Sequence, residues 1–161
     1  MKKNAIVFSV LLCTAVIAAV LITFMFHSRP EPLEPSPFCG TVTDRVSVRF
    51  REGEGLQNGW LDLTVINHSD EVFVGTREFF VEVWEDGAWY SLPYVVEDPR
   101  FPEDGYWIDP FSSGNEIFPV STYYGELAPG RYRLLSADCR YCTPGVDFIP
   151  ENHFFVFEFT V

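Results

Sequence analysis

Two cysteines separated by two residues form the most pointed chemical motif of this sequence: Cys139 and Cys142 flank an Arg-Tyr pair. A Cys-x-x-Cys motif can perform thiol–disulfide exchange or supply half of a zinc site. Exchange needs a thiolate stabilised by a helix N-terminus, whereas these cysteines fall in a predicted loop between two strands. A complete zinc site needs a second such pair, which the sequence lacks. We therefore expect a structural disulfide, with redox or metal chemistry as the alternative.

A second candidate site is the long segment 93–111, which contains four prolines and several acids. Long loops commonly carry binding functions, and aromatic side chains beside carboxylates suit sugars, peptides or cationic groups. The candidate binding residues are Tyr94, Phe101, Tyr106, Trp107 and Phe111. The alternative is a crossover whose aromatic side chains fold back onto the core, with residues 106–108 as a short strand.

Other catalytic patterns are missing from the sequence. His27, His68 and His153 do not have the spacing of metal ligands. There is no nucleophile elbow, phosphate-binding glycine loop or zinc-protease motif. We therefore expect no catalytic residue, no cofactor and no bound metal, and a protein that is not an enzyme.

The distribution of charge excludes one class of partner. All 23 acidic residues lie at or beyond Glu31, and eight arginines accompany them, so residues 30–161 carry a net charge of −15. A polyanion of this density is repelled by the phosphates of nucleic acids and by anionic lipid surfaces. We expect no binding to nucleic acid and no peripheral adhesion to membranes.

The segment before this acidic part predicts where the protein sits. Residues 5–26 carry no charge, and at about 1.5 Å per residue such a helix is long enough to cross a bilayer. Lys2 and Lys3 precede the span and acids follow it, which predicts that the C-terminal part lies outside the membrane. We expect an uncleaved signal anchor over residues 1–27, with the membrane as a partner through the apolar span. A cleaved signal peptide and lipidation of Cys13 are the alternatives.

A proline-rich segment follows the anchor. Residues 28–38 contain Pro30, Pro32, Pro35 and Pro37, which disfavour both helix and sheet. We expect a semi-rigid stalk in the polyproline II conformation, roughly 30 Å long, before a domain that occupies residues 39–161.

Within this domain, apolar residues alternate with polar ones, which is the period of a half-buried strand. The expected strands cover residues 46–50, 61–65, 79–83, 88–92, 116–120, 131–136 and 153–161. Asp86 and Gly87 predict a tight hairpin turn before Trp89. We therefore expect Gly87 and Trp89 to be structural residues of this hairpin. About seven short strands, with no convincing helix, indicate an all-β, immunoglobulin-like antiparallel sandwich.

One tyrosine receives a structural interpretation. Tyr132 follows a Pro129-Gly130 turn at the start of the penultimate expected strand. In a tyrosine corner, the phenol hydroxyl bonds to backbone a few residues upstream and fixes a strand as it crosses between sheets. We assign this role to Tyr132, supported by Pro129 and Gly130.

Five motifs occur in a characteristic order: VINHSDEVFVG (65–75), EFFVEVWEDGAWYSLP (78–93), GYWIDP (105–110), YGELAPGRYRLL (124–135) and the final FFVFEFTV. This order resembles a bacterial immunoglobulin-like domain of small membrane-anchored or lipid-anchored extracellular proteins, mostly of Gram-positive bacteria. The resemblance implies the fold and an extracellular setting, and it offers no catalytic residues to transfer. The sequence departs from the family pattern in carrying Cys139 and Cys142, and at Pro110-Phe111, where the family tends to have Pro-Gly.

The immunoglobulin-like fold also bears on the cysteines. In such a sandwich, the start of the first strand and the loop between the last two strands lie at the same end, which would bring Cys39 near Cys139 and Cys142. A bridge from Cys39 would close a loop of about 100 residues and constrain the unfolded chain far more than a local bridge. We expect Cys39 to pair with Cys139 or Cys142, and both pairings stay open.

These features predict a membrane-tethered, extracytoplasmic immunoglobulin-like module with a non-catalytic interaction or structural role in the cell envelope. Its expected partner is a protein or a cell-wall ligand. One alternative is a receptor for cell-wall carbohydrate. The other is a thiol-redox or metal-dependent envelope protein that uses Cys139 and Cys142.

Overall fold

The computed structural model describes residues 32–38, 41–53, 55–142 and 153–161. The folded unit begins at Leu33 and runs to Val161. The predicted anchor over residues 1–27, with Cys13, and the predicted disulfide partner Cys39 lie outside the described residues. Within the described ranges, no helix combines the length and the apolar character that crossing a membrane requires.

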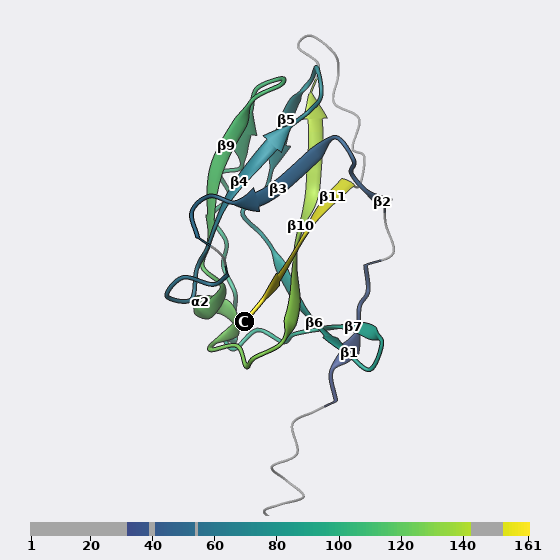
Figure 1. The fold of residues 1–161 in the computed structure, drawn as a ribbon, viewed down its shortest axis with the longest axis vertical. Coiled ribbons are helices and arrows are strands. Elements are labelled where there is room, and N and C mark those ends of the chain that lie inside the picture. Colours follow the sequence, from purple (N-terminus) through teal and green to yellow (C-terminus); the bar gives the residue numbers. More distant parts are fainter. Residues whose placement is uncertain (1–31, 39–40, 54, 143–152) are drawn as a thin grey trace, which may run out of the picture. The chain divides into compact units, whose positions relative to one another are not determined.

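Eleven strands and one short helix make up the described part of the chain. In chain order they are β1 (Glu34–Pro35), β2 (Thr41–Val42), β3 (Val46–Phe50), β4 (Leu61–Asn67), β5 (Val72–Gly75), β6 (Phe80–Glu85), β7 (Ala88–Ser91), β8 (Tyr106–Ile108), β9 (Ser113–Phe118), α2 (Val120–Tyr124), β10 (Arg131–Cys142) and β11 (His153–Thr160). The larger sheet has the order β1-β7-β6-β10-β11-β2, with β5 joined to β10 and β8 joined to β5, and the smaller sheet has the order β3-β4-β9. Figure 1 shows the long strand β10 running from the region of β6 to that of β5.

The two sheets pack through alternating apolar residues. In the smaller sheet, the central strand β4 buries Leu61, Leu63 and Val65 completely. In the larger sheet, β11 buries Phe155 and Phe159 on the same face. Each such side chain contributes about 1.5–3 kcal/mol when it is fully removed from water. These residues belong to a single hydrophobic core, so the predicted all-β sandwich is confirmed.

The β6–β7 hairpin follows directly from its turn residues. Asp86 and Gly87 have φ of 49° and 85°, the positive values that a two-residue type I′ turn needs at both positions. Trp84 and Trp89 pair across the hairpin, with their ring centroids 5.0 Å apart. The predicted hairpin is therefore confirmed.

The sequence pattern missed several short strands. β1, β2 and β5 have two to four residues, too few for a clear alternation. The strand β8 coincides with the short strand that the crossover interpretation of segment 93–111 expected. In addition, β2 pairs with β11 in parallel, so the larger sheet is not wholly antiparallel as predicted.

The expectation of a domain without helix was wrong. The predicted strand 116–120 ends at Phe118. After Pro119, the helix α2 begins at Val120. Pro119 has no N–H to donate to a sheet, which favours an end of β9 at this point. Val120 and Tyr124 are four residues apart and both are buried, so α2 packs one face inward. A helix of five residues gives too little periodicity to be recognised in a sequence.

The last part of the predicted stalk belongs to the folded unit. Glu34–Pro35 forms β1, an edge strand that pairs with β7. An edge strand tolerates proline because its outer side has no ladder hydrogen bond to complete. The Ser36 N–H donates to the Trp89 carbonyl at 3.0 Å, and the Phe38 ring packs 5.0 Å from that of Phe80. The domain therefore takes in residues 33–38, which the sequence prediction assigned to the stalk.

The predicted loop around Cys139 and Cys142 is also a strand. Both cysteines lie in β10, which has a register shift between Ser136 and Cys139 and a φ of 55° at Asp138. A bulge of this kind bends a strand. Before the bulge β10 pairs with β6, and after it β10 pairs with β5. The sequence pattern failed here because the bulge breaks the alternation.

Candidate functional site

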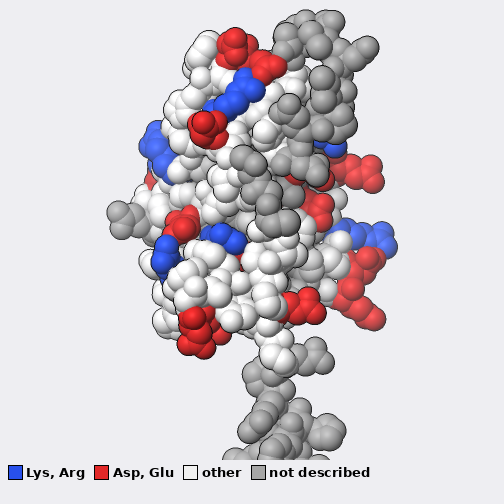
Figure 2. All heavy atoms as spheres, turned by 90° about the vertical axis from the view of Figure 1, so that its right-hand side faces the viewer, with Lys and Arg blue, Asp and Glu red and all other residues white. Residues whose placement is uncertain are grey.

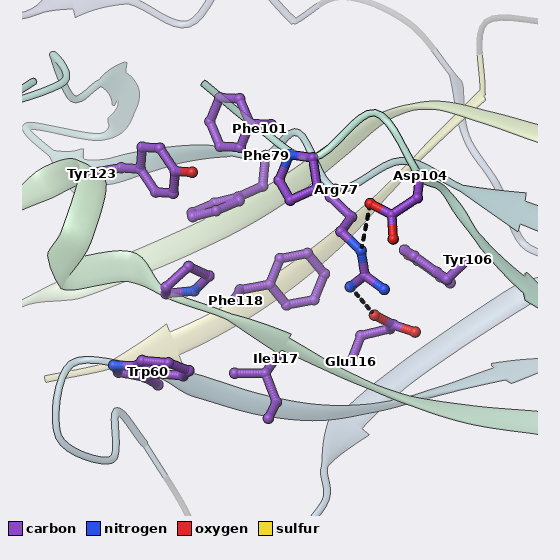
Figure 3. Close-up of a pocket in the computed structure, with 12 residues that line it drawn as sticks. Trp60, Arg77, Phe79, Phe101, Asp104, Tyr106, Glu116, Ile117, Phe118 and Tyr123 are labelled. Carbon is purple, nitrogen blue, oxygen red and sulfur yellow. Dashed lines mark hydrogen bonds and ion pairs between the residues drawn. The ribbon is translucent and has the colours of Figure 1, made fainter. Parts of the chain in front are cut away.

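A cleft of about 420 Å³ is lined by residues from both sheets and from α2. The lining residues are Trp60, Arg77, Phe79, Phe101, Pro102, Asp104, Tyr106, Glu116, Ile117, Phe118, Pro119 and Tyr123. They come from β8, β9, α2, the residue before β4, the β5–β6 connection and the loop before β8. Figure 3 shows the rings of Phe101 and Tyr123 at one end of the cleft and three charged side chains at the other.

The charged end contains Arg77, Asp104 and Glu116. Arg77 Nη1 donates to Glu116 Oε2 at 2.9 Å, and Arg77 Nε lies 3.7 Å from Asp104 Oδ1 (Figure 3). The Glu116 side chain is 13% exposed, whereas that of Asp104 is 69% exposed. Burial raises the pKa of Glu116, an effect that Arg77 opposes and Asp104 reinforces. One guanidinium is thus held between two carboxylates of very different exposure.

The apolar end is made of aromatic rings. Phe101 stacks on Tyr123 with ring centroids 4.4 Å apart, and both rings meet the fully buried Phe79 edge-on. Trp60 and Ile117 remain 47% and 46% exposed. Ring faces that stay partly open stack on apolar groups and attract cations. The cleft therefore joins two chemically different surfaces.

Local backbone contacts hold these rings in place. Gly59 has a φ of 83°, and a Cβ at this position would lie 2.1 Å from Ser121 Oγ, so glycine lets the turn before Trp60 approach α2. The Ser121 N–H donates to the Gly59 carbonyl at 2.9 Å. The Tyr123 hydroxyl donates to the Arg100 carbonyl at 2.7 Å, which ties the loop before β8 to α2.

The structure distributes the five candidate binding residues of segment 93–111 among three environments. Phe101 and Tyr106 line the cleft, although Tyr106 on β8 is buried, with only 5% of its surface exposed. Tyr94 is partly buried and packs against the core. Trp107 and Phe111 are 67% and 73% exposed and lie outside the cleft lining. Part of the segment thus folds back onto the core, and part of it contributes to the cleft.

Trp60, Arg77 and Glu116 line the cleft but were not among the binding residues expected from the sequence. Glu116 shares the inward face of β9 with the buried Phe118. A charge on the inward face of an expected strand was therefore an available signal. Trp60 and Arg77 lie outside the long alternating runs and gave no comparable signal.

Tyr132 makes the hydrogen bond that defines a tyrosine corner. Its hydroxyl donates to the Ala128 carbonyl, four residues upstream, at 2.7 Å. Its side chain is 4% exposed. The adjoining Pro129-Gly130 turn is attached to the end of the chain, because Gly130 and Val161 exchange backbone hydrogen bonds of 3.0 and 3.1 Å. These contacts fix the start of β10.

The two described cysteines are free thiols. Three residues of extended strand separate their Cα atoms by about 10 Å, too far for a disulfide, so a local Cys139–Cys142 bridge is excluded. Cys139 is buried, and its thiol donates to the Ser136 carbonyl at 3.3 Å. Burial raises the pKa of Cys139 to about 12, which keeps it protonated at neutral pH. The expected structural disulfide is therefore not supported within the described residues, and Cys39, the proposed partner of either cysteine, lies outside them.

Most described arginines pair with acids. Ion pairs involve Arg45, Arg51, Arg77, Arg100, Arg131 and Arg133. On the face near β2 and β7, acidic side chains lie beside the basic ones, and the described residues visible there form no extended basic patch (Figure 2). In the part of the chain that the structure describes, no group of three or more His, Cys, Asp or Glu residues could hold a metal ion.

The comparison with protein families agrees with this architecture. A family model described as a bacterial Ig-like domain matches residues 45–137, more than half of the 161 residues. The matched range runs from the residue before β3 into β10 and includes every residue that lines the cleft. No curated protein and no solved structure matches the chain.

Proposed function

Because the chain belongs to the bacterial Ig-like domain family, whose members are typically non-catalytic, we propose that it is a membrane-tethered, extracytoplasmic binding module of the cell envelope. Residues 5–26 anchor the chain, and the proline-rich residues before Leu33 space the domain from the bilayer. The cleft between Trp60 and Asp104 receives the partner, which is a protein or a cell-wall ligand.

The cleft is the observation that carries the binding role. It places the partly exposed Trp60 ring beside an ion pair whose Arg77 and Glu116 side chains are 35% and 13% exposed. A part-exposed ion pair contributes at most about 1 kcal/mol to the free energy of unfolding, so stability alone gives little reason for this cluster. Recognition of a ligand that is partly apolar and partly charged would account for these charged side chains beside the aromatic rings.

The proposed tether rests on the first part of the sequence. Residues 5–26 carry no charge, Lys2 and Lys3 precede them, and the acids follow. This order favours a span with its N-terminus in the cytoplasm. The acidic domain would then face the envelope, where its charge disfavours nucleic acids as partners.

The thiol-redox alternative has lost support. Cys139 is buried and protonated at neutral pH, whereas exchange needs an accessible thiolate. A strand also directs residues three positions apart to opposite faces, so Cys142 is no partner for Cys139. Carbohydrate binding stays as the second candidate function, because Trp60 offers a partly exposed ring to a sugar face.

Photocrosslinking in living cells tests the binding role. A photoreactive amino acid in place of Ile117, which is 46% exposed at the cleft, is expected to give a crosslinked adduct. The same amino acid in place of Val161, which is 42% exposed and outside the cleft lining, should give none. Trp60→Ala should abolish the adduct, whereas Trp107→Ala, a change of an exposed tryptophan outside the cleft lining, should preserve it. An adduct that is missing at position 117 or insensitive to Trp60→Ala would contradict the proposal.

A further inference from the structure

We propose that the cleft binds the cationic side chain of a basic polypeptide segment, with its aliphatic stem against the aromatic end and its head at the carboxylates of Asp104 and Glu116. This inference rests on the binding role proposed above and names the ligand chemistry of the same cleft.

The charged end has an excess of negative charge. Two carboxylates face a single guanidinium, that of Arg77. The contact between Arg77 and Asp104 is loose, at 3.7 Å, and the Asp104 side chain is 69% exposed, so its carboxylate is accessible to a second cation. A ligand cation beside Asp104 would bring the cluster to neutrality.

The rest of the cleft suits the stem of such a side chain. Lysine and arginine pack their methylene groups along apolar surface while the charged head stays among polar groups. Figure 3 shows Phe101 and Tyr123 at one end of the cleft, with Asp104 and Glu116 at the other. Aromatic faces also attract the cation itself. Stem and head therefore each have a matching surface.

The charge distribution disfavours the other ligand classes. A carboxylate or phosphate would meet Asp104 and Glu116, while Arg77 is already engaged with both. The net charge of −15 over residues 30–161 attracts cationic partners and repels anionic ones. A neutral sugar would use the rings but would gain nothing from the excess charge. The observations thus favour a basic polypeptide over a carbohydrate.

The test observes Trp60 directly. The full-length chain in detergent micelles is labelled with fluorotryptophan, and the Trp60 signal is assigned by its loss in Trp60→Phe. Capped pentapeptides of glycine with a central lysine, arginine or norleucine are then titrated by fluorine NMR. The lysine and arginine peptides should shift the Trp60 signal saturably and bind about tenfold more tightly than the norleucine peptide at low salt.

Matched variants separate the charge from the fold. Asp104→Asn should weaken binding of the lysine peptide by about threefold to fivefold and leave binding of the norleucine peptide unchanged. Glu103→Gln removes a neighbouring exposed acid outside the cleft lining, so it should change neither affinity. Equal affinities for the lysine and norleucine peptides, or unchanged lysine binding in Asp104→Asn, would overturn the cationic ligand.

A neutral disaccharide of N-acetylglucosamine is titrated in the same way as the peptides. A Trp60 shift with this sugar and none with the peptides would overturn the inference in favour of a carbohydrate ligand. No shift with any probe would overturn it as well. In each case the binding role survives as long as the Ile117 photocrosslink depends on Trp60, so the two failures are distinguishable.

Discussion

Glu116 is the residue whose protonation most directly changes the charge of the cleft. Its pKa is raised by burial, against the effect of Arg77 and together with that of Asp104, so the folded state binds its proton more readily than the unfolded state. Glutamine cannot gain this proton. The wild type should therefore gain stability relative to Glu116→Gln as the pH falls from 7 toward about 4, and lose that gain as the pH rises through the folded-state pKa.

Urea unfolding of the wild type and Glu116→Gln at several pH values between 4 and 7 measures this difference. A difference that stays constant, or that shrinks toward acid pH, would show that the Arg77 ion pair outweighs the burial of Glu116. Asp62→Asn is the control for removing an ion-paired acid elsewhere, because Asp62 on β4 pairs with Arg51 and lies outside the cleft lining.

Phe111 is a residue held in a conformation that suits glycine better. It has a φ of 53° and follows Pro110, and the Ser112 N–H donates to the Asp109 carbonyl at 3.2 Å, as in a type II turn. Its side chain is 73% exposed, so packing offsets little of the strain. Phe111→Gly should raise the free energy of unfolding by about 0.5–1 kcal/mol, since the relief of strain exceeds the entropy that glycine adds to the unfolded chain.

Phe111→Ala keeps the strain and should not be stabilising, which makes it the control in the same denaturation series. If the alanine variant were as stable as the glycine variant, the backbone conformation at position 111 would not be the cause.

At the scale of elements, β10 places its two cysteines in different environments. A maleimide at pH 7 should modify Cys142, which is half-buried, and should spare the buried Cys139, whose pKa is raised to about 12 by burial. Both should react in denaturant, and peptide mass mapping identifies the sites. Labelling of Cys139 in the folded protein would contradict its burial. If Cys142 reacts only after a reductant is added, it is bound in a disulfide, and Cys39 is the predicted partner.

The pairing of β6 with β10 contains a buried ion pair. Glu82, which is fully buried, accepts a hydrogen bond from Arg133, and Arg133 Nη2 also donates to Ser36 Oγ at 3.2 Å in the segment after β1. Glu82→Gln leaves the arginine charge without its counter-ion and should cost about 3 kcal/mol. Replacing both Glu82 and Arg133 by methionine should restore most of this loss. Chemical denaturation of the two variants measures both free energies of unfolding, and a double methionine variant no more stable than Glu82→Gln would contradict the argument.

How far the sequence predicts this fold depends on the length of each element. β3 shows an alternation over five residues, and the Asp86-Gly87 turn allows only a few residue types, so both were predictable. β1 and α2 depend on what they pack against, which no short pattern records. Only part of the cleft could be predicted, because some of its residues come together only through tertiary packing. Phe101 comes from a conspicuous aromatic segment, whereas Arg77 and Glu116 are 39 residues apart and meet only when the two sheets have packed.

At the scale of the whole molecule, positive charge precedes the acidic part of the chain. Lys2, Lys3 and Arg29 lie in the first 29 residues, and all 23 acids follow them. Within the described residues, most arginines are engaged in ion pairs. The acidic excess is therefore a property of the domain surface, and it suits a partner of opposite charge.

The same division of charge predicts the topology of the full-length chain. Positive residues before an apolar span remain in the cytoplasm, so the domain that begins at Leu33 should lie outside and stay attached through residues 5–26. Protease added to intact, wall-stripped cells should digest the domain, and the mature protein should retain its N-terminal segment. Lysed cells provide the control for protease sensitivity. Protection of the domain in intact cells would refute the orientation, and a mature protein that begins after residue 26 would refute the uncleaved anchor.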